Sequence, residues 1–137
     1  PTTVFSYFQP GYEIPGLKIL GPAFGILSTS TTLRRANAVN TLVYSGVNVT
    51  TAPNTDRPRG TSLDLTNLET IANANPGGVA DQLNALMLHG TMSTQMRNSL
   101  ITAMSAINDA DTVVRARKRA RTAVYLVSTS SQFDIQR

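Results

Sequence analysis

Five positive side chains lie within seven residues and form the chain's densest group of chemically active residues. They are Arg115, Arg117, Lys118, Arg119 and Arg121, five of the twelve Lys and Arg residues, and the rest of the chain is close to neutral. On a helix, at 100° per residue, Arg115, Lys118, Arg119 and Arg121 would spread over the outer face, with Arg117 beside the apolar stripe. Such a face can contact the acids of another protein or the phosphates of a nucleic acid.

The residues around these cations favour the protein contact. No aromatic side chain is interleaved with them to stack on bases, and no recognised DNA-binding motif surrounds them. Runs of charge are commonly solvated faces, with one or two arginines paired to carboxylates such as Asp109, Asp111 or Asp81. We therefore predict that Arg115, Lys118, Arg119 and Arg121 form an interaction face for protein, with nucleic acid as the less favoured partner.

The remaining reactive side chains do not form a catalytic constellation. His89 is the only histidine and stands before Gly90, where we expect it to cap the end of a helix. The eight acidic residues show no spacing that singles out a pair for hydrolysis. Cysteine is absent, which excludes disulfides, thiolate metal sites and cysteine nucleophiles. We therefore predict no catalytic residue, no metal site and no cofactor in this chain.

Length and composition indicate one folded domain. The chain has 137 residues, of which 41% are hydrophobic and 15% charged, and its formal net charge is +4. This composition argues against wholesale disorder, and the length suits a single domain over residues 1–137. No apolar run approaches the roughly 18 residues that a membrane span needs, so we predict no transmembrane segment.

Apolar periodicity predicts an all-α fold, a single helical bundle of about five helices. The expected helices cover 29–46 (most clearly 30–45), 66–73, 76–89, 93–107 and 111–128. Their inward faces are expected to include Val79, Leu83, Leu86 and Met87, then Met96, Leu100 and Met104, and finally Val113, Ala116, Ala120, Ala123, Val124 and Val127. Residues 47–62 read as a polar, mobile loop, although residues 47–50 offer a short strand as an alternative.

Capping residues support these helix starts. Thr66 and Glu69 match a capping box, in which the two side chains satisfy each other's backbone amides. Asn75 followed by proline, then Ser93, and then Asp109 or Asp111, stand where the next three helices should begin.

The first 28 residues are rich in proline, glycine and aromatic side chains. Pairs such as Pro10-Gly11 and Pro15-Gly16 mark turns, so we expect an extended segment, with a short helical turn at residues 3–8 as an alternative. Its large apolar groups are too many for a free linker. We predict that they dock on the bundle or on a partner chain; the candidate docking residues are Phe5, Tyr7, Phe8, Tyr12 and Phe24.

Several stretches together resemble the carboxy-terminal part of a bacterial family of domains of unknown function, the one numbered eighteen hundred. The resemblance is carried by residues 1–8 with Pro10, Tyr12, Pro15 and Gly16; by 21–26; by 35–37 with Val39 and Asn40; by 89–93; and by 119–125 leading to Ser130, Gln132, Phe133 and 135–137. It covers most of the chain except the loop at 47–62. Ala23 stands where the family pattern leads us to expect an acid.

The resemblance implies a location and a parent protein rather than a reaction. Members of the family resemble long, mainly helical, exported bacterial proteins, often encoded beside sulfatase-like partners. This chain lacks their long amino-terminal helical region and begins at Pro1 without a signal peptide, so we expect a fragment or processed piece of a longer, extracytoplasmic or secreted protein. The resemblance supplies no activity.

The expected function is a non-catalytic structural or interaction module. It would dock onto the missing upstream part of its parent or onto other protein subunits, with a second copy of the chain as a further alternative. Two other functions stay open: part of an enzyme whose active site lies mainly outside this chain, and, less favoured, a nucleic-acid-binding domain that uses the basic helix.

Overall fold

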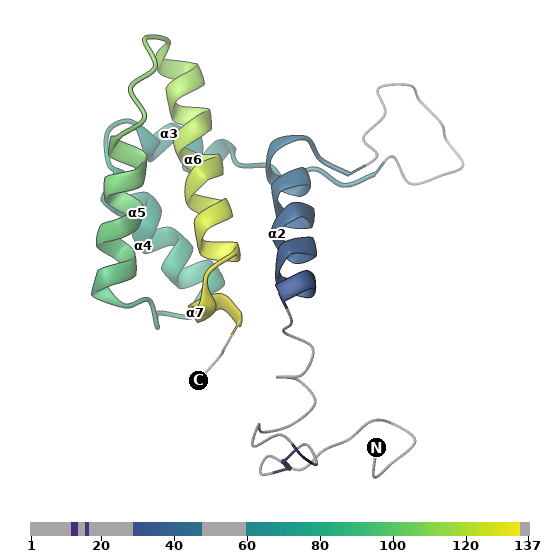
Figure 1. Cartoon of the computed structure of the whole chain (residues 1–137). Coiled ribbons are helices and arrows are strands. Elements are labelled where there is room, and N and C mark those ends of the chain that lie inside the picture. The colour runs from purple at the N-terminus through teal and green to yellow at the C-terminus, as the bar shows by residue number, and fades with distance from the viewer. Residues whose placement is uncertain (1–11, 14–15, 17–28, 48–59, 135–137) are drawn as a thin grey trace. The chain divides into compact units, whose positions relative to one another are not determined.

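The computed structural model describes residues 12, 13, 16, 29–47 and 60–134, and it confirms the all-α class (Figure 1). Within these residues the helices are α2 (Thr29–Tyr44), α3 (Thr66–Ala72), α4 (Pro76–Met87), α5 (Thr94–Ser105), α6 (Thr112–Ser128) and α7 (Ser131–Asp134). The predicted segments at Phe5, Tyr7, Phe8 and Phe24, the helical turn at 3–8 and most of the loop at 47–62 lie outside the described residues.

Contacts divide the chain into two compact units, residues 1–37 and 38–137, and helix α2 runs across the boundary. In the first unit the structure describes residues 12, 13 and 16 and the amino-terminal part of α2. In the second, α6 packs against α3, α4, α5 and α7, while α4 also packs against α3 and α5. Helix α6 is thus the central element of the bundle.

The core is built from aliphatic side chains of α3–α6 and from the alanine stripe of α6. Leu100, Met104, Val79 and Val127 are its largest fully buried side chains. Ala120 and Ala123 are completely buried, and their small side chains let neighbouring helices approach α6 closely. Val43, near the end of α2, joins the same cluster.

Three of the predicted helix caps are confirmed. The Asn75 side chain accepts from the amide of Gly78 at 2.8 Å, and Pro76 occupies the first turn of α4. Ser93 Oγ accepts from the amide of Met96 at 3.2 Å. Asp111, rather than Asp109, caps α6, because its Oδ1 accepts from the Val113 amide at 2.8 Å. These bonds satisfy amide donors that a helix start leaves unpaired.

The capping box predicted at Thr66 and Glu69 is wrong. Helix α3 begins at Thr66 itself, so this residue lies inside the helix instead of before it. The N-cap residue is Leu65, which makes no side-chain capping bond. Asp64, one residue earlier, satisfies the Thr66 amide instead, since its Oδ1 accepts from Thr66 N at 3.0 Å and from Thr66 Oγ1 at 2.6 Å. An aspartate just before a helix can accept hydrogen bonds from the unpaired backbone amides at the helix start, as a threonine can. The sequence pattern therefore did not show which of the two residues would do so.

Two apolar residues assigned to the core are instead exposed. Leu86 in α4 is 66% exposed and Val113 in α6 is 60% exposed. Helical spacing places both on or near the inward face, but it does not tell how far the neighbouring elements extend. Val113 lies in the first turn of its helix, and Leu86 lies at the edge of the face centred on Val79 and Leu83.

The second predicted helix of the carboxy-terminal half ends earlier than expected, and His89 is not a cap in its last turn. Helix α4 ends at Met87, and the Asn84 carbonyl accepts from the amides of Leu88 and Gly90. His89 is exposed, with φ at +50°, and Gly90 follows with φ at +84°. Two successive left-handed residues reverse the chain, which is why the helix stops there.

The strand considered at 47–50 is reduced to one bridge in the described residues. Val47 and Thr61 exchange two backbone hydrogen bonds, 2.8 and 3.0 Å long, in antiparallel register. No helix in the described part of the chain is long and apolar enough to span a membrane.

Candidate functional site

Helix α6 does not present its basic cluster as one outer face. Asp111 fixes where the helix starts, and the alanine stripe fixes which side is buried. Within that frame, the five cations from Arg115 to Arg121 meet very different surroundings. Their partners decide which of them can act on another molecule.

Arg119 is the main correction to the predicted face, because it is only 9% exposed. Its Nε and Nη2 donate to the Ile107 carbonyl at 3.2 and 3.0 Å. Its Nη1 lies 3.4 and 3.5 Å from the carbonyls of Ala72 and Asn73. These carbonyls belong to the ends of α5 and α3, where helix dipoles favour a positive charge. Arg119 therefore joins three helices and is not available to a partner.

Arg115 and Arg121 are also engaged within the chain. Arg115 Nε donates to Asn73 Oδ1 at 3.2 Å, and its Nη1 donates to the Asp109 carbonyl at 3.3 Å. Arg121 Nη1 donates to the Tyr44 carbonyl at 3.2 Å, at the end of α2. Both side chains are only partly exposed. They tie α6 to neighbouring elements more than they face solvent.

Lys118 and Arg117 are the two exposed cations of the cluster. Lys118 Nζ lies 2.6 Å from Asp109 Oδ1, and its side chain is 55% exposed. Arg117 Nε lies 3.8 Å from Glu69 Oε1, and its side chain is 50% exposed. The sequence analysis expected Asp109 to pair with an arginine of the cluster, whereas the structure pairs it with Lys118. It did not single out Arg117, which it placed beside the apolar stripe.

Exposed valines accompany these two cations. Val113 and Val114 are 60% and 36% exposed, and each lies four residues before a cation, so each pair shares one side of the helix. We call Val113, Val114, Arg117 and Lys118 the valine–cation face. It lies in the first half of α6, where the helix carries both apolar surface and positive charge toward solvent.

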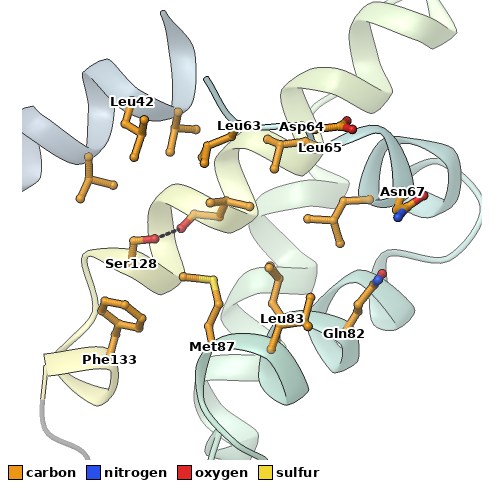
Figure 2. Close-up of a pocket in the computed structure, with 15 residues that line it drawn as sticks. Leu42, Leu63, Asp64, Leu65, Asn67, Gln82, Leu83, Met87, Ser128 and Phe133 are labelled. Atoms are coloured by element: carbon orange, nitrogen blue, oxygen red, sulfur yellow. Dashed lines mark hydrogen bonds between the residues drawn. The ribbon is translucent and has the colours of Figure 1, made fainter. Parts of the chain in front are cut away.

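A second candidate site, which sequence reasoning missed, is an apolar pocket in the unit formed by residues 38–137. Its volume is about 490 Å³, and it lies among the end of α2, the segment before α3, and helices α3, α4, α6 and α7 (Figure 2). Its apolar lining residues are Val39, Leu42, Val43, Leu63, Leu65, Leu68, Leu83, Leu86, Met87, Val124 and Phe133. No single stretch of sequence carries it, because six segments contribute.

Four polar residues complete the lining: Asp64, Asn67, Gln82 and Ser128. Ser128 is buried, and its Oγ donates to the Val124 carbonyl at 2.8 Å, so its polarity is satisfied within α6. Figure 2 shows Asn67 and Gln82 on the side of the pocket away from Phe133. The two hydrogen bonds from Thr66 lower the pKa of the Asp64 carboxyl, which is therefore ionised at neutral pH.

The short helix α7 brings Phe133 to the pocket. It was not predicted, and a pair of hydrogen bonds holds it against the start of α5. Gln132 Nε2 donates to Ser93 Oγ at 2.7 Å, and Gln132 Oε1 accepts from the Ser93 amide at 3.1 Å. The serine that caps α5 thus also positions one wall of the pocket.

The other predicted site residues add little to either site. Phe5, Tyr7, Phe8 and Phe24 fall outside the described residues, and Tyr12 is partly buried. Within the described part of the chain, no group of three or more His, Asp or Glu side chains is placed to hold a metal ion.

Comparison with protein-family models, with curated proteins and with solved structures finds no match for this chain. The family resemblance therefore stays a prediction from the sequence.

Proposed function

We propose that this chain is a non-catalytic interaction module of an exported bacterial protein. It docks through the valine–cation face onto a surface that offers both apolar side chains and carboxylates, either in the rest of a longer parent chain or in another subunit. The location outside the cytoplasm and the longer parent rest on the family resemblance.

One observation carries the proposal: exposed valines and exposed cations share one side of α6. Val113 and Val114 lie four residues before Arg117 and Lys118. Phosphate groups bind cations, and aliphatic side chains beside those cations add nothing to that binding. A protein interface, in contrast, combines an apolar centre with charged groups around it. The mixed chemistry of this face therefore favours a protein partner.

The fate of the other cations supports the same choice. Arg119 is buried, and Arg115 and Arg121 donate to groups within the chain. A face that neutralises phosphates needs several cations directed outward, and each contact adds to the salt dependence of binding. With two exposed cations in this cluster, binding to nucleic acid would be weak at physiological salt.

The test is co-purification of two polypeptides from the natural gene: this chain, and the part of the parent encoded upstream of it. We expect a complex that withstands moderate salt. Val113→Asp and Lys118→Glu should each weaken it at least tenfold, because one buries a charge in the apolar contact and the other reverses an attraction. Leu126→Asp and Arg34→Glu, which change exposed residues elsewhere, serve as controls and should leave it intact.

A parallel titration with labelled duplex DNA separates the two kinds of partner. We expect no binding near physiological salt. Micromolar DNA binding that is lost in Arg117→Glu with Lys118→Glu would refute the proposal, and so would a parent complex that Val113→Asp leaves unchanged. A gene that encodes nothing upstream of Pro1 would also refute docking onto a parent chain.

A further inference from the structure

We propose that the apolar pocket is a binding site for a small apolar molecule that is neutral or positively charged. It is independent of the proposed docking, because the pocket uses the second half of α6, and the valine–cation face uses the first half. The argument rests on the pocket's size, its lining and its charge.

The size of the pocket suits a ligand of one to three rings or a short branched chain. Its volume of about 490 Å³ falls within the roughly 300–1,000 Å³ that ligand sites in proteins occupy. Pockets between the helices of a bundle are among the usual places for such sites.

The chemistry of the lining selects an apolar ligand. Eleven of the fifteen lining residues are apolar, from Val39 in α2 to Phe133 in α7. Of the four polar ones, Ser128 is already bonded to its own helix. Asn67 and Gln82 remain on one side, where their amides can bond to a single polar group of the ligand (Figure 2).

Charge at the pocket disfavours anionic ligands. Asp64 is the only ionisable residue among the fifteen that line the pocket, so no Lys, Arg or His side chain there can neutralise an acid. Hydrogen bonds from Thr66 keep the Asp64 carboxyl ionised. A ligand carboxylate or sulfonate would be repelled by this charge, whereas an amine or an uncharged group would not.

The pocket is open to ligand from solvent. Leu63 and Leu86, which both line it, are 39% and 66% exposed. Exposed leucines at the mouth of an apolar recess are the arrangement expected when a ligand covers them on binding.

The experiment uses the full chain and two dyes that share one ring system. N-phenylnaphthylamine is neutral, and anilinonaphthalene sulfonate carries a negative charge. We expect the neutral dye to bind saturably at one site per chain, with an increase in fluorescence. The sulfonate should bind about twofold to fivefold more weakly, because the Asp64 carboxylate is exposed and water screens its charge. Asp64→Asn should strengthen binding of the sulfonate by the same factor and leave the neutral dye unchanged.

A matched pair of leucine variants locates the site. Leu86→Asp adds a charge at the pocket and should weaken binding of the neutral dye at least tenfold. Leu126→Asp changes an exposed leucine of α6 that does not line the pocket, and should have no effect. Both residues are on the surface, so both variants should fold, which circular dichroism verifies.

Three results would overturn the proposal. One is that the neutral dye does not bind saturably to the full chain. This result would also be seen if another part of the protein filled the pocket. The second is equal binding by the Leu86→Asp and Leu126→Asp variants. The third is a preference for the sulfonate that Asp64→Asn does not change. None of these results bears on docking through Val113 and Lys118.

Discussion

Replacing Arg119 by methionine is the most direct test of how α6 is held in the bundle. Methionine keeps much of the length and the apolar stem of arginine but removes every donor. The guanidinium now donates to the Ile107 carbonyl at 3.0 and 3.2 Å and approaches the Ala72 carbonyl at 3.4 Å. All of these contacts disappear in the Arg119→Met variant.

The expected loss follows from the groups left behind. A hydrogen bond from a charged donor contributes about 1.5–3 kcal/mol, and a buried acceptor left unpaired costs about 1–3 kcal/mol. The two bonds to Ile107 share one acceptor, and the approaches to Ala72 and Asn73 are long, so they do not add fully. Removing a buried charge also recovers part of its desolvation cost. We expect a net loss of about 2–4 kcal/mol in the free energy of unfolding.

Arg117→Met is the matched control, because it makes the same substitution in the same helix. The Arg117 side chain is half exposed, and its ion pair with Glu69 is 3.8 Å long, so its loss should cost less than about 1 kcal/mol. Urea unfolding followed by circular dichroism measures both variants, and a melting temperature lower by about 10 °C is expected for Arg119→Met. Equal stability of the two variants would refute the structural role of Arg119.

Three further predictions concern the bundle. Leu100→Asp buries an unpaired charge and should cost several kcal/mol in urea unfolding. Leu126→Asp, at a side chain that is 36% exposed, should cost only about 1–2 kcal/mol, and equal losses in the two variants would contradict the core assignment. Ser93→Ala removes a helix cap and should cost about 1–2 kcal/mol in thermal unfolding; an unchanged melting temperature would contradict this. The hydrogen bond from Arg97 lowers the pKa of Asp81 in the folded chain. The stabilisation from this pair should therefore be fully present above the unfolded-state pKa of about 3.9, and it should be lost as the pH falls through the lower folded-state pKa. NMR titration should find the Asp81 pKa raised toward its ordinary value in Arg97→Gln, and an unaltered pKa would argue against the pair.

Local sequence signals predicted the helices well, because helix starts and apolar periodicity act over a few residues. Asn75, Ser93 and Asp111 each cap the helix they were expected to begin. The failures also have local causes: Asp64 competed with Thr66 for the start of α3, and two left-handed residues at His89 ended α4 early. Where two neighbouring residues can both form hydrogen bonds at the start of a helix, the sequence pattern alone does not show which of them does.

The candidate sites were harder to predict, because they depend on contacts between distant segments. Arg119 was placed on an outer face from its angle around the helix, but carbonyls 12 and 47 residues away draw it inward. The flexible stem of arginine can bring its charge to acceptors beside a buried stripe. The pocket left no local sequence signal at all, since its lining comes from residues as far apart as Val39 and Phe133.

The basic cluster contains cations of two kinds: a buried one that stabilises the bundle, and exposed ones to which we assign the proposed docking. Arg119 serves the carbonyls at two helix ends, a task that needs a planar group with several donors and that burial makes inaccessible. Lys118 has a compact ammonium group on a flexible chain, and its pairing with Asp109 on the surface costs little to exchange for an acid of a partner. Adjacent cations in one helix can thus hold the bundle and remain available for docking, and variants at these two positions should separate loss of stability from loss of binding.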